Sequence, residues 1–327
     1  MTFLAGFLYF AAGPVFVDQA RLERELKVNN IAFVMQLKAA NNGYLYAYRF
    51  KHCIASICKH SSIGLTVHIF ANSFGKSQSS KILEVLAANC VNGFSVKFYD
   101  VDEVLEKVLP SINVIQDAIE VGGRNNTREA LFYLPIFMNL ILPGDVSRVI
   151  LLDVDFFFYT DIKQLFDHFD NFRNTTLFGL ALVQEPVYRR DFEKYREEHP
   201  GTKIGDPPPN GRTGYSRGLT MIHLDNMRRS ERYYSILLYN EVKKYAEKYQ
   251  FQGTRAQQDF FVLLDAEHHE DLFYVVPCQW NRQLYRGLSR DVDFDKFHNC
   301  PKPIHAYHGN GVARMPTMNN FHQFLFD

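Results

Sequence analysis

The sequence has no excess of either charge, because Lys and Arg together total 36 and Asp and Glu together also total 36. A chain without a basic surplus lacks the attraction that draws proteins to nucleic acid or to an anionic membrane surface, so neither is expected as its main partner. The 327 residues also contain no internal repeat and no long linker. We therefore predict a single domain behind a short N-terminal segment.

Cysteine is scarce and irregularly spaced. Its positions show neither a CxxC spacing nor a zinc-binding pattern. In an oxidising compartment Cys278 and Cys300 could form a disulfide and leave at least one thiol unpaired. In the cytosol all of the cysteines would instead be buried apolar residues. The five positions are Cys53, Cys58, Cys90, Cys278 and Cys300.

The N-terminus is expected to be a targeting segment. Residues 3–17 form an almost uninterrupted apolar run, which is shorter than a membrane span of about 20 residues and close in length to the core of a signal peptide. No basic residue precedes the run, and Pro14 lies at a candidate cleavage position. We interpret residues 1–29 as a signal anchor with a stem; a cleaved signal peptide and a buried helix are the alternatives. Two sequons, Asn125-Asn126-Thr127 and Asn174-Thr175-Thr176, agree with a secretory route.

Strand and helix patterns alternate along the rest of the chain. The predicted strands cover residues 31–37, 65–70, 94–99, 149–152, 177–183, 219–223 and 272–276. The predicted helices cover residues 44–60, 79–89, 127–142, 162–169, 233–249 and 257–267. This alternation predicts an α/β fold whose mostly parallel sheet has helices on both faces.

The most informative stretch is VILLDVDFFFYTDI, residues 149–162. Its apolar beginning is typical of a strand covered on both faces, and Asp153 and Asp155 follow at a spacing of two. Side chains at this spacing point the same way, so both carboxylates can bind one divalent cation that phosphate oxygens also coordinate. Open α/β sheets bind ligands at this end of their strands. An ordinary acidic strand end is the alternative, and Asp161 is expected to cap the next helix.

Several stretches, in this order, resemble the family 8 retaining glycosyltransferases of the GT-A fold. They are Lys38-Ala39-Ala40-Asn41-Asn42, LLDVD at 151–155, LFDHFDNF from Leu165, Pro186-Val187-Tyr188-Arg189, Gln258-Asp259-Phe260-Phe261, Trp280-Asn281-Arg282-Gln283-Leu284 and His308-Gly309-Asn310. Within this family the chain is most similar to the xyloside α-1,3-xylosyltransferases of the endoplasmic reticulum. The resemblance implies one GT-A catalytic domain, Rossmann-like with a mostly parallel mixed sheet, over residues 30–327.

The resemblance also implies a metal centre. Asp155 would bind Mn²⁺ directly, Asp153 would contribute to the metal and the donor ribose, and Mg²⁺ is the alternative ion. The third ligand would be the histidine that opens a motif near the C-terminus. Both His305 and His308 lie there, and we choose His308 because it begins His-Gly-Asn-Gly.

The implied donor is a UDP-sugar, UDP-xylose in the xylosyltransferase subgroup. The loop after the first strand would receive the uridine, and the glycine of the C-terminal motif would allow close approach to the diphosphate. The residues assigned to donor binding are Lys38, Ala39, Asn41, Asp153, Val154, Gly309 and Asn310.

For catalysis, the resemblance implies same-face substitution in which the leaving phosphate accepts the proton of the acceptor, with no carboxylate nucleophile. Gln258 would stabilise charge near the anomeric centre. Asp259 would orient the substrate, or it would have a structural role at a helix start.

The implied acceptor is a xylose–glucose unit on epidermal-growth-factor-like (EGF-like) repeats of Notch-type proteins. We assign Tyr188, Arg189, Trp280 and Asn281 to substrate binding, and we expect the charged segment 188–210 to be exposed and to contact the acceptor protein. The expected location is the endoplasmic reticulum membrane, as a single-pass type II protein with a lumenal domain; the Golgi is the alternative.

The chain departs from the family pattern around the expected sugar pocket. Gln257 stands where the family has an aspartate, Ser216 and Arg217 replace an asparagine and a serine, and residues 126–129 differ from the subgroup. Two alternatives therefore stay open. The chain could use a different UDP-sugar or acceptor, or it could be a pseudoenzyme that binds nucleotide sugar or glycan.

Overall fold

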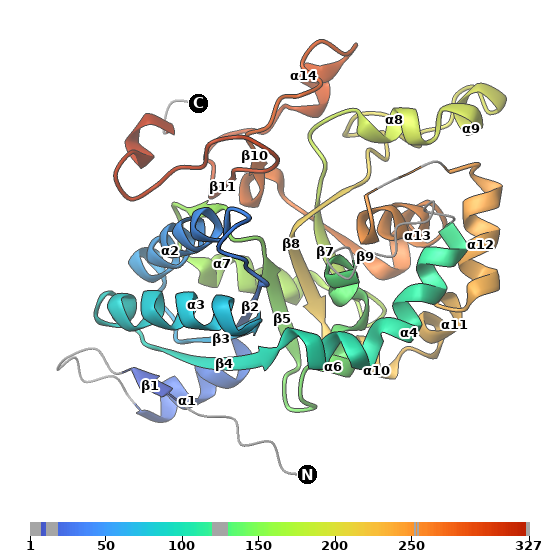
Figure 1. Cartoon of the computed structure of the whole chain (residues 1–327). Helices are drawn as coiled ribbons and strands as arrows, with labels where there is room; N and C mark the ends of the chain where they lie inside the picture. Colours follow the sequence, from blue (N-terminus) through green and yellow to red (C-terminus); the bar gives the residue numbers. More distant parts are fainter. Residues whose placement is uncertain (1–7, 11–18, 120–129, 252, 254, 325–327) are drawn as a thin grey trace.

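The computed structural model describes residues 8–10, 19–119, 130–251, 253 and 255–324 (Figure 1). Its main sheet has eight strands in the order β1-β4-β3-β2-β5-β8-β7-β9. They are β1 (Leu8–Phe10), β2 (Asn30–Met35), β3 (Leu65–Ala71), β4 (Phe94–Asp100), β5 (Arg148–Leu152), β7 (Phe178–Leu182), β8 (Tyr215–His223) and β9 (Phe273–Val276). Strand β1 runs antiparallel to β4 and β8 runs antiparallel to β5 and β7, whereas the other pairs are parallel. The predicted α/β fold with a mostly parallel mixed sheet is confirmed.

Both faces of the sheet are buried, which explains its apolar strands. Ile31, Phe33 and Met35 of β2 enter one core cluster and Ala32 enters the other, as the two-residue period of a strand requires. Helices α2 and α3 cover one face, and α4, α12 and α13 cover the other (Figure 1). The helices are α1 (Gln19–Val28), α2 (Gly43–His60), α3 (Ser73–Leu86), α4 (Val101–Ile119), α6 (Met138–Ile141), α7 (Ile162–Asp167), α8 (Val187–Asp191), α9 (Glu193–Glu198), α10 (Leu224–Arg229), α11 (Glu231–Ile236), α12 (Tyr239–Lys248), α13 (Gln257–Leu272) and α14 (Phe294–Phe297).

A second, three-stranded sheet lies at the carboxyl end of β5. It has the order β10-β11-β6, formed by β10 (Arg282–Gln283), β11 (Ala306–His308) and β6 (Phe156–Phe158). Strand β11 pairs antiparallel with β6, so that His308 lies opposite Phe156. This sheet was not predicted, because strands of two or three residues are too short to show a hydrophobic period. It brings the C-terminal segment next to Asp155.

Some helices differ from the prediction. Helix α3 begins at Ser73, before the expected residue 79, because the Asn72 side chain accepts a hydrogen bond from the Gly75 N–H and caps the first turn. The described part of the expected helix 127–142 is a 3-10 helix over Leu131–Phe137 followed by α6; Pro135 has no N–H for an α-helical turn. The expected helix 233–249 is divided into α11 and α12, and α4 has no counterpart in the prediction. The predicted cap is confirmed, since Asp161 accepts a hydrogen bond from the Lys163 N–H.

Helix α1 packs against the beginning of β3, an interior strand of the sheet. Its Glu25 accepts a hydrogen bond of 2.7 Å from the Gly64 N–H, and Thr66 donates a bond of 2.6 Å to the Leu26 carbonyl. The remainder of the predicted signal anchor, except for β1, and the sequon at 125–127 lie outside the described residues. No helix in the described ranges is both long enough and apolar enough to span a membrane.

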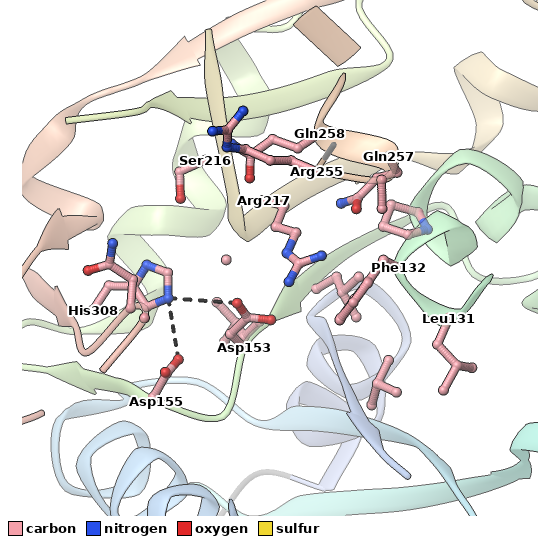
Figure 2. A pocket seen from close by; sticks show the side chains of 18 of the residues that line it. Leu131, Phe132, Asp153, Asp155, Ser216, Arg217, Arg255, Gln257, Gln258 and His308 are labelled. Atoms are coloured by element: carbon pink, nitrogen blue, oxygen red, sulfur yellow. Dashed lines mark ion pairs between the residues drawn. The ribbon is translucent and has the colours of Figure 1, made fainter. Parts of the chain in front are cut away.

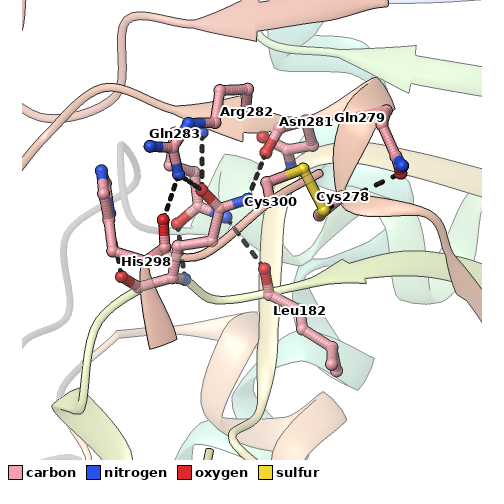
Figure 3. The surroundings of a disulfide bond; sticks show 9 residues. Leu182, Cys278, Gln279, Asn281, Arg282, Gln283, His298 and Cys300 are labelled. Carbon is pink, nitrogen blue, oxygen red and sulfur yellow. Dashed lines mark hydrogen bonds between the residues drawn. A yellow bond between two sulfur atoms is a disulfide. The ribbon is translucent and has the colours of Figure 1, made fainter. Parts of the chain in front are cut away.

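Two disulfides cross-link the chain. The predicted Cys278–Cys300 bond is confirmed, and it joins the segment after β9 to the segment after α14 (Figure 3). A second bond, Cys58–Cys90, joins the last turn of α2 to the segment before β4. Cys53 is buried and unpaired, which agrees with the expectation of at least one free thiol.

Candidate active site

The ends of β5 and β11 bring two carboxylates and an imidazole together. Asp153 and Asp155 follow β5, and one ligand atom from each of Asp153, Asp155 and His308 lies within 4.8 Å of the others. The Nε2 atom of His308 lies 3.3 Å from Asp155 Oδ1 and 3.7 Å from Asp153 Oδ2 (Figure 2). The side chain of Asp153 is 49% exposed, whereas that of Asp155 is 12% exposed. The cluster therefore has one open side, toward Asp153.

The ring of His308 is fixed by its neighbours. Its Nδ1 lies 2.9 Å from Asn281 Oδ1, so a proton on Nδ1 is donated to this amide oxygen and Nε2 faces the carboxylates. The ring stacks on Phe156, with centroids 4.3 Å apart. On its other side lies Gly218, where an added Cβ would be 2.2 Å from His308 Cε1. The site needs a glycine at 218 because of this contact.

The charges in the cluster favour a bound cation. Desolvation lowers the pKa of His308, but the two carboxylates outweigh it and raise the pKa to about 9. Desolvation likewise opposes ionisation of Asp153, but His308 and Arg217 hold the pKa of Asp153 below its usual value. Arg49 of α2 pairs with Asp155 Oδ2 at 3.1 Å. Apart from the 3.3 Å contact with His308 Nε2, the buried Oδ1 of Asp155 has no hydrogen-bond partner among the described residues, and such an atom fits a metal ligand.

This cluster forms part of the wall of a cavity of about 1020 Å³. The cavity lies at the carboxyl ends of the neighbouring strands β2 and β5, from which the sheet extends to β3 on one side and to β8 on the other. Ligands bind at such a point in open α/β sheets. Gln36, Leu37 and Tyr46 form part of its wall near β2, and Arg217 of β8 and Gln257 of α13 form another part.

Several predicted site residues reach this cavity. Asp153, Val154, Asp155, Gln258, His308 and Asn310 all line it. Lys38, Ala39 and Asn41 are exposed in the turn before α2, where the Lys38 carbonyl accepts the N–H groups of Asn41 and Gly43. The preceding residues Gln36 and Leu37 line the cavity instead.

The glycine and asparagine of the C-terminal motif have structural contacts. A Cβ added to Gly309 would lie 2.7 Å from Met315 Cβ, so the glycine permits packing against Met315. The expected close approach of Gly309 to a diphosphate stays a prediction. The Asn310 side-chain oxygen accepts the N–H groups of Leu284 and Tyr285 at 3.0 Å each and thereby holds that loop.

The assignment of Trp280 and Asn281 to substrate contact is wrong. Trp280 is 2% exposed and its indole N–H donates to His168 Nε2 at 3.0 Å. Asn281 is fully buried and contacts His308. Both side chains therefore support the site from behind. His305, the alternative ligand, contacts Thr160 and the Trp280 ring and lies outside the cluster.

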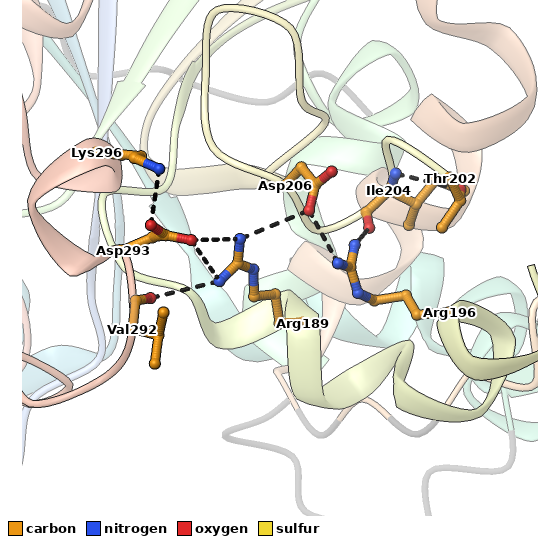
Figure 4. Close-up of polar contacts among 8 residues, drawn as sticks. All are labelled: Arg189, Arg196, Thr202, Ile204, Asp206, Val292, Asp293 and Lys296. Carbon is orange, nitrogen blue, oxygen red and sulfur yellow. Dashed lines mark hydrogen bonds and ion pairs between the residues drawn. The ribbon is translucent and has the colours of Figure 1, made fainter. Parts of the chain in front are cut away.

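The segment 188–210 was expected to be exposed, and this prediction is wrong for its first residues. Tyr188 is 1% exposed, because its ring packs between Phe192, Phe251 and the backbone of Gly214. The Arg189 guanidinium is bound within the protein: it contacts Asp206 at 3.6 Å and Asp293 at 3.3 Å (Figure 4).

Asp259 takes the structural role rather than the catalytic one. It is fully buried, and its carboxylate accepts the Arg255 N–H just before α13 begins. Desolvation raises the pKa of Asp259 to about 7. The neighbouring Gln258 does line the cavity, near Gln257 and Ser216 (Figure 2).

Two residues of the site, Arg49 and Gly218, were missed by sequence reasoning. Arg49 lies on an amphipathic helix, where a basic residue looks like a solvated one. Gly218 lies in a strand pattern, and a glycine inside a strand is a signal for close approach of another group. That signal was available in the sequence and points to Gly218.

No family model matches the sequence. Xyloside xylosyltransferase 1 of Mus musculus is 34% identical over 257 residues, which are 77% of this chain and 65% of that protein. The Homo sapiens protein of the same name is 33% identical with the same coverage. The crystal structure of the mouse protein, in its apo form, matches with a TM-score of 0.81 and 31% identity over 88% of this chain and 99% of that one. The chain belongs to the xyloside xylosyltransferase family.

The family assignment agrees with the predicted resemblance. The chain spans 65% of the length of these two curated family members. The fold is also shared with the galactosyltransferase LgtC, solved with donor and acceptor sugar analogs, at a TM-score of 0.52 and 17% identity over 87% of this chain and 88% of that one. The predicted GT-A glycosyltransferase fold in a single domain is confirmed.

Proposed function

We propose that this chain transfers xylose from UDP-xylose, with retention of configuration, in α-1,3 linkage onto the xylose of an O-linked xylose–glucose unit on EGF-like repeats of Notch-type proteins. Membership in the xyloside xylosyltransferase family supports the choice of sugar. The observation that carries the proposal is the convergence of Asp153, Asp155 and His308 at the edge of a large cavity.

Mn²⁺ is the proposed metal, with Mg²⁺ as the alternative. Asp153, Asp155 and His308 would hold it, since carboxylate oxygens and an imidazole nitrogen suit a divalent ion that also binds phosphate. The Asp155 oxygen that lacks a hydrogen bond supports this choice. Such an ion supplies Lewis-acid stabilisation of the charge that develops on the leaving diphosphate.

The remaining chemistry is assigned to side chains of the cavity. Gln258 would place its amide near the anomeric carbon, where positive charge develops, and the leaving phosphate would accept the proton of the acceptor hydroxyl. Glu185 also lines the cavity, but its Oε1 accepts the Leu288 N–H at 2.9 Å. We therefore assign Glu185 to holding the loop that contains Leu288, and not to nucleophilic attack.

The proposed location is the lumen of the endoplasmic reticulum, with the Golgi as the alternative, and residues 1–29 would anchor the domain 30–327 as a type II membrane protein. The two disulfides support an oxidising compartment. The exposed Asn174 of the second sequon is accessible to glycosylation.

A donor panel tests the proposed reaction. The protein with Mn²⁺ receives an EGF-like repeat that carries xylose–glucose, together with UDP-xylose, UDP-glucose or UDP-galactose in separate reactions. Intact mass of the repeat is then measured. We expect addition of one pentose, from UDP-xylose only. Addition of a hexose, or no addition from any donor, would contradict the proposed donor.

A second candidate is transfer of another UDP-sugar. It is favoured by Gln257, Ser216 and Arg217, which line the cavity together with Asp153.

A further inference from the structure

The cavity has a cationic region that transfer of a neutral pentose leaves unused. Arg217 lies on β8, and its guanidinium carbon is 3.6 Å from the centre of the Phe132 ring. This stacking fixes the plane of the guanidinium. In Figure 2 the guanidinium lies between Asp153 and Phe132, on the side of Asp153 opposite to His308. It therefore points away from the metal cluster and into the part of the cavity that Gln257 also lines.

Arg217 differs from the other arginines of the cavity because no carboxylate of the described ranges forms an ion pair with it. Arg49 pairs with Asp155 and Arg255 pairs with Asp191. Arg217 does interact electrostatically with Asp153, and this interaction helps to lower the pKa of Asp153. Once Asp153 binds a metal, little of its charge remains for Arg217. The guanidinium would then be without a close counterion among the described residues, although Asp117 also lines the cavity.

Gln257, which lines the same part of the cavity, is neutral and polar. It is 1% exposed, and its side-chain oxygen has no hydrogen-bond partner among the described residues. Gln257 adds no charge to this part of the cavity, and Arg217 adds a positive one. A cation with this environment is suited to an anionic ligand group.

We infer that this region of the cavity takes a uronic acid as the donor sugar, that is UDP-glucuronic acid, with Arg217 paired to the sugar carboxylate. The inference rests on the proposed function in one respect, that the cavity binds a UDP-sugar. Xylose and glucuronic acid have the same ring and the same hydroxyl configuration, and they differ only at C5, where glucuronic acid has a carboxylate. With C5 of the donor sugar placed beside Arg217, the cavity would accommodate both sugars.

The transfer step is the same for either sugar. The bond between the anomeric carbon and the β-phosphate oxygen breaks, and the bond to the acceptor oxygen forms. The acceptor proton passes to the leaving UDP. The carboxylate undergoes no change, so Arg217 acts as a specificity-determining residue.

The test compares two donors that differ only at C6. Binding of UDP-glucuronic acid, UDP-glucose and UDP to the full chain with Mn²⁺ is measured by calorimetry. We expect UDP-glucuronic acid to bind about tenfold or more tightly than UDP-glucose, because a charge-assisted pair replaces a neutral contact. Arg217→Gln should remove this preference and leave the affinity for UDP unchanged.

Two variants serve as controls. Arg217→Lys keeps the charge but not the planar stack, and it should retain part of the preference. Arg255→Gln removes a cation of the same cavity that is already paired with Asp191, and it should affect both sugars equally.

Three results would overturn the inference. The first is equal binding of the two donors by the wild type. The second is loss of UDP affinity in Arg217→Gln, which would assign the guanidinium to the diphosphate. The third is a gain of UDP-glucose binding in Arg217→Ala, which would mean that the arginine excludes the hexose sterically. Failure of the proposed xylosyl transfer is a separate outcome. It would appear as no pentose addition from UDP-xylose while the preference for UDP-glucuronic acid persists.

Discussion

The imidazole of His308 depends on residues that contact it from outside the metal cluster. Asn281 contacts Nδ1, Phe156 stacks on one side of the ring, and Gly218 leaves room for it. Outer contacts of this kind orient a metal-binding histidine, and their loss typically lowers metal affinity about 10- to 100-fold. The geometry of the site is therefore sensitive to residues that never touch substrate.

Gly218→Ala tests this dependence directly. The added methyl group would lie 2.2 Å from His308 Cε1, so the ring must move away from the carboxylates. We expect Mn²⁺ affinity to fall about tenfold or more, and stability to fall by about 1–3 kcal/mol from overpacking. Titration of free Mn²⁺ by electron paramagnetic resonance measures the affinity.

The matched control is Gly144→Ala. A Cβ at Gly144 meets nothing within 4 Å, so this variant should bind Mn²⁺ as the wild type does. Unchanged Mn²⁺ affinity in Gly218→Ala would show that the site adapts and that Gly218 does not hold the ring in place.

Asp259 links stability to pH. Burial raises the pKa of Asp259 to about 7, whereas an unfolded aspartate titrates near 4. Between these values the folded state holds a proton that the unfolded state releases. This contribution to stability is therefore complete below about pH 4 and is lost as pH rises to about 7.

Asp259→Asn should remove this pH dependence, since Asn keeps an acceptor for the Arg255 N–H but does not ionise. From pH 5 to pH 8 the stability of the variant relative to the wild type should rise by about 3 kcal/mol. Urea unfolding at the two pH values measures the difference. A constant difference between the two proteins would mean that Asp259 does not titrate in this range.

At the residue scale, the sequence predicted the metal cluster but not the support around it. Asp153 and Asp155 could be predicted because two carboxylates at a strand end converge by the geometry of an extended chain. His308 was found through the family motif. The residue type alone cannot tell which way a side chain faces, so Tyr188, Trp280 and Asn281 were assigned to substrate although all are buried.

At the scale of elements, two segments that project from the sheet are joined by one charge network, which we call the Arg189 clasp: Arg189, Arg196, Asp206, Asp293 and Lys296 (Figure 4). Arg189 of α8 contacts Asp206 in the loop after α9 and Asp293 just before α14. Its guanidinium also lies 5.1 Å from the centre of the Phe297 ring. The clasp thus fixes α8 and its loop to α14.

Arg189→Leu should release both segments, because Asp206 and Asp293 lose their shared partner. We expect faster amide hydrogen exchange in residues 200–212 and 289–297, with a stability loss of about 1 kcal/mol, since the pairs are partly exposed. The control is Arg190→Leu, because the Arg190 side chain is 62% exposed and, among the described residues, pairs with Asp291 alone. Equal exchange in the two variants would contradict the clasp.

Most strands and the first helix after β2 could be predicted because their apolar runs and periods are strong. The second sheet could not, since β6, β10 and β11 are set by contacts between distant segments. The 3-10 helix at Leu131–Phe137 was not predicted either, because an apolar run does not by itself distinguish a 3-10 helix from an α-helix.

At the scale of the whole molecule, the fold explains how the site is assembled. The parallel half of the sheet ends beside Asp153 and Asp155, and the C-terminal segment returns to add His308 through β11. The Cys278–Cys300 bond lies in this returning segment. One GT-A domain therefore contains all the parts of the site, and family membership agrees with that assembly.

The measurement that tests the central claim most directly is xylose transfer by Asp155→Asn, beside the wild type, over a range of Mn²⁺ concentrations. The substitution keeps the size of the side chain and removes the charge that faces His308, so thermal unfolding should show a folded protein. The account predicts that intact mass of the acceptor repeat shows one added pentose with the wild type and none with the variant. Transfer by Asp155→Asn at the wild-type rate would contradict it, since the Asp153–Asp155–His308 cluster would then not hold the metal on which transfer depends.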